Sequence, residues 1–71
     1  MCLSIPGKIE SIKGETAIVN INGVEVLTSL QLIDNARIGD YVLVHTGYAL
    51  QILNKEEVKD AKDNLKLLYN G

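Results

Sequence analysis

Two side chains of this sequence could carry nucleophilic or metal-binding chemistry, the thiol of Cys2 and the imidazole of His45. A cysteine and a histidine together can form a hydrolase site, in which the imidazole removes the thiol proton and the thiolate attacks. Such a site also needs rigid supports and a residue that orients the histidine. Cys2 stands near a chain end, where a position is poorly fixed unless it docks elsewhere. We therefore predict no catalytic residue, and a thiol enzyme is retained only as an alternative.

The same two side chains could instead bind a metal ion, because iron(II), zinc and copper accept thiolate and imidazole ligands. A closed structural zinc site takes four cysteine or histidine ligands, whereas this sequence contains one of each. The pair therefore predicts an open site, completed by small ligands or by another protein, as in a carrier. From spacing alone, the alternative is that Cys2 is an inert small residue and His45 is solvated at a strand end.

Removal of Met1 would strengthen the carrier hypothesis. Methionine before a small residue such as cysteine is commonly removed, which would leave the α-amino group of Cys2 beside its thiol. The positive charge of that amino group would favour the thiolate, which is the nucleophilic and metal-binding form of cysteine. An exposed and activated thiol is suited to take up a ligand and to release it.

Strands must position these residues, because β-branched side chains are dense from residue 5 to residue 52. The alternation over residues 16–21 predicts a strand with one buried face. Asn22-Gly23 follows it and predicts a type I′ hairpin turn, since both central residues of that turn need a positive φ. The return strand is expected to continue at period two as far as Leu32.

Further strands are expected before and after this hairpin. They cover residues 5–12, the apolar run 41–45 after a loop at 34–40, and residues 48–53 beyond Gly47. About five short strands with regularly spaced turns indicate a small barrel rather than a parallel sheet. We therefore predict a mainly β fold, a five-stranded OB-like barrel followed by one C-terminal α-helix.

The dipeptide Pro6-Gly7 supports two interpretations. In the structural interpretation it only turns the chain into the first strand, where proline is tolerated at a strand beginning, an edge or a bulge. In the functional interpretation Pro6 stiffens the segment that precedes it, so that an apolar arm with a thiol at its tip projects toward a partner. Leu3 and Ile5 would then contact that partner.

The helix is predicted by a change of composition to Lys, Glu, Asp and Leu after residue 54. Asn54 is a favourable N-cap, and Glu57 can bond back to the N–H of the cap residue in a capping box. The helix is expected over residues 54–69. Its apolar residues form one stripe that can pack against the barrel, and they are Val58, Ala61, Leu65 and Leu68.

Size and composition indicate one small folded domain. The chain has 71 residues and 46% hydrophobic residues, and we expect a single domain over 1–71, with the barrel at about 1–53. One cysteine cannot form an internal disulfide, which fits a reducing compartment. No apolar run approaches the roughly 20 residues of a membrane span, and no signal peptide is evident. We therefore predict a cytoplasmic protein without membrane contact, monomeric when free.

Charge and aromatic content argue against nucleic acid as the partner. The net charge is −2, and the only aromatic residues are three tyrosines. Binding to single strands relies on positive charge along the backbone and on aromatic rings for the bases. An OB-fold nucleic-acid-binding module is nevertheless kept as the alternative function, because the expected barrel is of that type.

Two sequence segments carry a family resemblance. Residues 1–8 read Met-Cys-Leu-Ser-Ile-Pro-Gly-Lys, and residues 39–49 read Gly-Asp-Tyr-Val-Leu-Val-His-Thr-Gly-Tyr-Ala. With the short helix of acidic and basic residues at the end, they closely resemble the HypC/HupF family of NiFe-hydrogenase maturation chaperones. The resemblance spans nearly the whole chain, and the Met-Cys-x-x-x-Pro block is specific because it is tied to the N-terminus.

The resemblance implies an OB-like barrel with a C-terminal helix and no catalytic activity. It also implies two partners: HypD, the iron-sulfur protein on which the Fe(CN)₂CO unit is built, and the precursor of the hydrogenase large subunit. By the family pattern, Cys2 engages iron and both partners after loss of Met1, and His45 is the second candidate ligand. Iron would be held transiently, as Fe(CN)₂CO shared with HypD, without a permanently bound cofactor. Partner contacts are expected at Cys2, Leu3, Ile5, Pro6 and His45.

Overall fold

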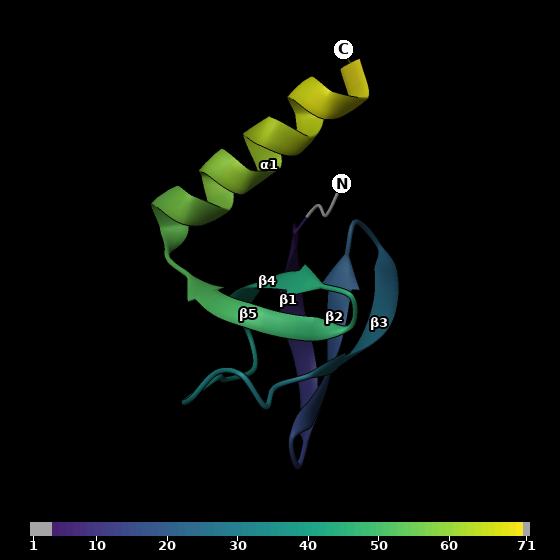
Figure 1. Ribbon diagram of the computed structural model, residues 1–71, viewed down its shortest axis with the longest axis vertical. Coiled ribbons are helices and arrows are strands. Elements are labelled where there is room, and N and C mark those ends of the chain that lie inside the picture. Colours follow the sequence, from purple (N-terminus) through teal and green to yellow (C-terminus); the bar gives the residue numbers. More distant parts are fainter. Residues whose placement is uncertain (1–3, 71) are drawn as a thin grey trace.

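The computed structural model describes the backbone of residues 4–70 and the side chains of residues 4–62. Five strands close into a barrel in the order β1-β2-β3-β5-β4, and the helix follows the last strand (Figure 1). A meander of three strands that is closed by two further strands has the OB-type arrangement. The mainly β fold predicted from the sequence is therefore confirmed. The elements are β1 (Ile5–Lys13), β2 (Thr16–Ile21), β3 (Val24–Ser29), β4 (Tyr41–His45), β5 (Tyr48–Leu53) and α1 (Lys55–Asn70).

The β2–β3 hairpin forms where the sequence predicts it. Asn22 has a φ of 52° and Gly23 a φ of 89°, as a type I′ turn requires. Ile21 pairs with Val24 across the turn. The Gly23 N–H also donates a hydrogen bond to Oδ1 of Asn20, at 2.8 Å. This local chemistry sets the register of the whole β2–β3 ladder.

The return strand is shorter than predicted. β3 ends at Ser29 rather than at Leu32. The N–H of Leu30 still donates to the carbonyl of Glu15 at 2.7 Å, but the chain then turns, with the N–H of Ile33 donating to the carbonyl of Leu30 at 3.2 Å. Leu30 is nevertheless a core residue, whereas Leu32 is 60% exposed. The apolar alternation predicted burial correctly at Leu30 but could not show where strand pairing ends.

The core lies inside the barrel and consists of small and β-branched side chains. Ile9, Val19 and Val42 have no exposed surface. They come from β1, β2 and β4, so the same cluster joins strands that are far apart in the sequence. Leu30 packs into this cluster from the segment after β3. The complete cluster is Ile9, Ala17, Val19, Leu30, Val42, Val44 and Ala49.

Pro6 and Gly7 are both buried in β1. The N–H of Ile9 donates to the carbonyl of Asp40, next to β4. Along an antiparallel strand, the N–H groups of successive residues point to opposite neighbouring strands. The nitrogen of Pro6 therefore faces β2, where strand pairing begins only at Lys8. Pro6 thus occupies an unpaired strand beginning, as its missing N–H requires.

Gly7 is needed for close packing between β1 and β2. A Cβ atom added at Gly7 would lie 2.4 Å from Cγ1 of Val19 and 2.8 Å from Cγ1 of Ile21. Both distances are shorter than any ordinary contact between carbon atoms. Gly7 therefore has a packing role inside the barrel.

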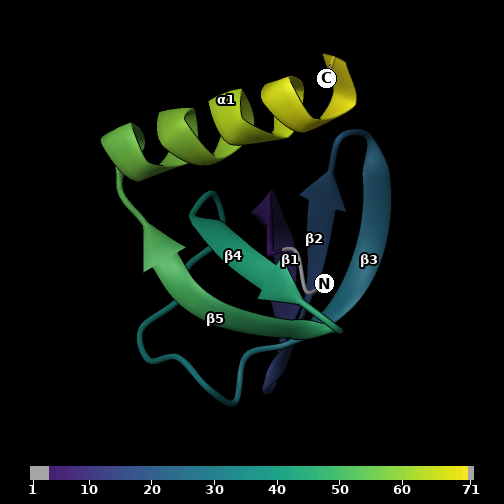
Figure 2. The same cartoon turned by 45° about the horizontal axis from the view of Figure 1, so that its top comes forward.

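The helix begins with the predicted capping box. The N–H of Glu57 donates to Oδ1 of Asn54 at 2.8 Å, and the N–H of Asn54 donates to Oε1 of Glu57 at 3.0 Å. Helix α1 then crosses one end of the barrel (Figure 2) and contacts β1 and β5. Val58 and Ala61 of the predicted stripe are half-buried, whereas Leu65 and Leu68 lie outside the described side chains. Within residues 4–70 we find no helix with the length and apolarity needed to cross a bilayer.

Candidate functional site

His45 is the last residue of β4 and leads directly into a tight hairpin. Thr46 and Gly47 have φ values of 48° and 83°, so both residues have the positive φ of a type I′ turn. His45 pairs with Tyr48 on the other side of that turn. The imidazole is therefore carried at the rigid end of a paired strand, and the residue is half-buried.

The same hairpin also closes the barrel. Ser29 at the end of β3 pairs with Tyr48, the only residue pair recorded between β3 and β5 in the described part of the chain. The N–H of Ser29 donates to the carbonyl of Gly47 at 2.8 Å. Closure therefore holds the His45 hairpin against β3, and the position of His45 depends on the complete barrel.

Strand β1 begins beside this hairpin. Ile5 pairs with Val44 in the antiparallel β1–β4 ladder, one residue before His45. Ile5 is half-buried, and Pro6 behind it is buried. The fold therefore brings the start of β1 next to the His45 hairpin. Ile5 lies on the face of the core residue Val44, whereas Pro6, opposite Leu43, lies on the outward face that also carries His45.

Cys2 and Leu3 lie outside the described residues, and their roles stay predictions. In the sequence, Cys2 lies three positions before Ile5. Three residues span at most about 10 Å when fully extended. The length of the chain therefore limits how far Cys2 can be from the start of β1.

Several exposed apolar residues near the hairpin were not identified from the sequence. Tyr48 is 43% exposed, Leu50 40% and Ile52 36% on β5, and Leu27 on β3 is 66% exposed. Residues 41–54 include no Lys, Arg, Asp or Glu. The sequence did not predict which of these apolar residues are exposed, because apolar and polar residues do not alternate strictly along β5. In addition, the pairing of β4 with β5 shifts register between Leu43 and Val44.

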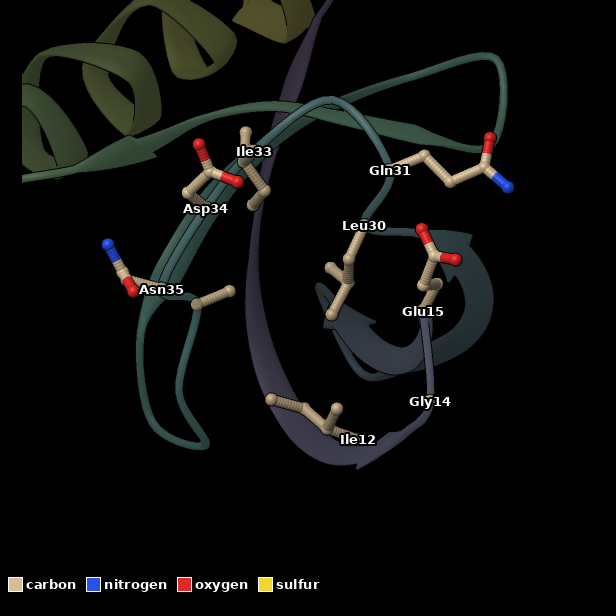
Figure 3. A pocket seen from close by; sticks show the side chains of 9 residues that line it. Ile12, Gly14, Glu15, Leu30, Gln31, Ile33, Asp34 and Asn35 are labelled. Carbon is tan, nitrogen blue, oxygen red and sulfur yellow. The ribbon is translucent and has the colours of Figure 1, made fainter.

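A separate pocket of about 310 Å³ is formed by the end of β1 and the loop after β3. Figure 3 shows Ile12, Leu30 and Ile33 around it, together with the carboxylates of Glu15 and Asp34. None of the residues predicted to bind metal or a partner lines this pocket. The candidate site therefore stays at the His45 hairpin.

The described residues do not themselves form a multidentate metal site. Among residues 4–62, whose side chains the structure describes, no group of three or more His, Cys, Asp or Glu side chains is placed to hold a metal ion. Within this part of the chain, His45 is the one residue that sequence reasoning named as a metal ligand.

Comparison with known proteins gives a consistent result. The model of the HupF/HypC family matches residues 1–66. A protein named hydrogenase maturation factor HypC from Escherichia coli (strain K12) is 33% identical over 76 aligned residues, which cover 99% of this chain and 84% of the relative. Proteins of the same name from Azotobacter chroococcum and Rhizobium leguminosarum are each 40% identical over 60 residues. These alignments cover 83% of this chain and 71% and 80% of the two relatives. Because the family match covers nearly the whole sequence, this chain belongs to the HupF/HypC family.

Proposed function

We propose that this protein is a hydrogenase maturation factor that carries the Fe(CN)₂CO unit from HypD to the precursor of the hydrogenase large subunit. Membership of the HupF/HypC family supports the maturation role, as do the names of the relatives. In this role the protein is a cytoplasmic chaperone that delivers a cargo, and the iron unit is that cargo rather than a resident cofactor.

The pairing of Ile5 with Val44 is the observation that carries the proposal. It places the start of β1 beside His45, and Cys2 lies only three positions before Ile5 in the sequence. A thiolate and an imidazole are both suitable ligands for iron(II). Two protein ligands leave the other positions of the iron to carbon monoxide, cyanide and HypD, so the cargo is held without being enclosed.

The partner surface we propose is centred on the same end of the barrel. Its contact residues are Cys2, Leu3, Ile5, Pro6 and His45, and Ile5 is half-buried at the start of β1. The uncharged hairpin around His45 fits such a surface, because burying charged groups without partners is costly. The large-subunit precursor and HypD would use this surface in turn.

The test is co-purification with HypD, followed by infrared spectra of the complexes in the region of the CN and CO stretching bands. Wild type is compared with Cys2→Ala and His45→Ala. We expect Cys2→Ala to fold normally but to lose both the bands and HypD, because it removes the thiolate ligand. We expect His45→Ala to weaken the bands more than it weakens HypD binding.

Ser4→Ala is the matched control, since it also shortens a small side chain near the N-terminus without removing a proposed ligand. It should retain HypD and the bands. Cys2→Ala protein that kept both HypD and the bands would contradict the proposal. So would a Cys2→Ala protein that failed to fold, because Cys2 would then have a structural role.

A further inference from the structure

A groove of about 230 Å³ lies between the barrel and helix α1. Its floor comes from β1 and β4, and one wall comes from the helix. The residues that matter here are Lys8 on β1, Asn20 on β2, Tyr41 on β4 and Lys62 on α1. Pro6 also lines the groove, so the groove starts next to Ile5, which belongs to the proposed partner surface.

Two lysines from different elements meet at Tyr41. Lys8 pairs directly with Tyr41 in the β1–β4 ladder, and side chains that are directly opposite in a ladder lie on the same face of the sheet. Nζ of Lys62 lies 4.8 Å from the centroid of the Tyr41 ring. The fold therefore gathers two positive charges around one tyrosine, although the whole chain has a net charge of −2.

One acidic side chain, Glu10, also lines this groove. Its Oε2 accepts a hydrogen bond from Nδ2 of Asn20, at 3.3 Å. Glu10 is therefore tied to Asn20 of β2, and two lysines against one carboxylate give the groove lining a net positive charge.

We propose that this groove receives an acidic side chain, Asp or Glu, of the partner polypeptide. The carboxylate would accept charge-assisted hydrogen bonds from Lys8 and Lys62. A carboxylate fits better than a phosphate group, because Glu10 in the same lining repels a singly charged carboxylate less than a more highly charged phosphate. The inference rests on the proposed function, since it extends the surface that binds HypD past Pro6 to Lys62.

The test measures the affinity for purified HypD with two charge-reversal variants, Lys8→Glu and Lys62→Glu. Each variant replaces attraction with repulsion, so we expect each to weaken binding by about tenfold at low salt. The double variant should be weaker than either single variant. The differences should shrink as salt is added, because ions screen exposed charges.

Lys59→Glu is the matched control. Lys59 is an exposed lysine on the same helix, and it does not line the groove. The same change of net charge should therefore alter the affinity by less than about twofold. Because Lys62 also contacts Tyr41, circular dichroism checks that each variant is folded, and Lys8→Glu tests the groove without removing the Lys62–Tyr41 contact.

The outcomes separate this inference from the proposed function. Wild type that does not bind HypD would overturn both. A second outcome would overturn only the groove. In it, wild type binds HypD and Cys2→Ala does not, but Lys8→Glu and Lys62→Glu bind HypD as well as Lys59→Glu does. Binding of a DNA oligonucleotide that is lost in Lys8→Glu, with HypD affinity unchanged, would also overturn it in favour of a phosphate ligand.

Discussion

The interior of the barrel and the His45 hairpin use the same strand for different purposes. In β4, Val42 and Val44 point into the core, whereas Leu43 and His45 alternate with them and are only half-buried. The inward side chains exclude water and stabilise the fold, and the outward ones remain available to a partner. In this strand, the inward face therefore serves stability and the outward face serves partner chemistry, so the two roles do not need separate segments of the chain.

Ile9→Ala is expected to have the largest effect, because Ile9 is fully buried at the centre of the core. Such truncations cost about 2–5 kcal/mol, whereas a core of this size supplies only about 3–5 kcal/mol in total. The variant should therefore be largely unfolded, as measured by urea unfolding with circular dichroism. The matched control is Ile38→Ala, since Ile38 is 65% exposed; equal unfolding midpoints for the two variants would contradict the comparison.

Gly7→Ala should be the next most destabilising change. Its new Cβ would collide with Cγ1 of Val19, and overpacking of this kind costs about 1–3 kcal/mol. Urea unfolding of Gly7→Ala, Val19→Ala and the double variant provides the measurement. The double variant should lose less stability than the sum of the single variants, because Val19→Ala removes the colliding atom. Strict additivity would show that the contact at Gly7 does not limit packing.

Asn54→Ala should destabilise the start of α1 by about 1 kcal/mol, because it removes the oxygen that accepts the N–H of Glu57. The expected result is a lower helix content in far-UV circular dichroism and a small decrease in the unfolding midpoint. Glu57→Gln is the control, since glutamine can still bond back to the N–H of Asn54. An Asn54→Ala protein as stable as wild type would contradict the prediction, and a loss in Glu57→Gln would show that the charge of Glu57 also contributes.

Glu25→Gln should change the pH dependence of stability. The side chain of Glu10 raises the pKa of Glu25 above 4.5, first through a hydrogen bond and then through its negative charge. Because the folded state favours protonated Glu25, this pair contributes stability below the ordinary pKa, and the contribution is lost as the pH rises through the raised pKa.

The gain in stability of Glu25→Gln over wild type should therefore grow between acidic and neutral pH, as measured by urea unfolding at several pH values. The effect should be small and should decrease with salt, because Glu25 is fully exposed. Glu56→Gln, at an exposed position in the first turn of α1, is the control for removal of one negative charge. A constant difference between Glu25→Gln and wild type across this pH range would contradict the prediction.

His45→Ala should have the smallest effect on folding, within about 0.5 kcal/mol of wild type, as is usual for substitutions away from the core. Val44→Ala, one residue earlier, should be clearly more destabilising, because Val44 is 6% exposed and belongs to the core. Urea unfolding of both variants tests the alternation of β4 directly. Equal losses would show that His45 also supports the fold.

Most of the secondary structure could be predicted, because its determinants lie within a few residues of one another. Asn22 and Gly23 specify their turn through backbone conformation, and Asn54 and Glu57 form their capping box across a single helical turn. The end of β3 could not be predicted, since the alternation reports which side chains are buried and not which strands pair. Similarly, the types of Cys2 and His45 suggested ligands, but no local pattern could give their surroundings.

The sequence by itself determined the strands, the turns, the helix start and the two candidate ligands, because short-range sterics and hydrogen bonds decide these features. Only the tertiary structure decided that Ile5 lies opposite Val44 and that Lys62 comes to rest over Tyr41. Such neighbours are far apart in the chain, and barrel closure and helix packing bring them together. The physical reason is that long-range pairing depends on the whole core at once, which no single stretch of residues encodes.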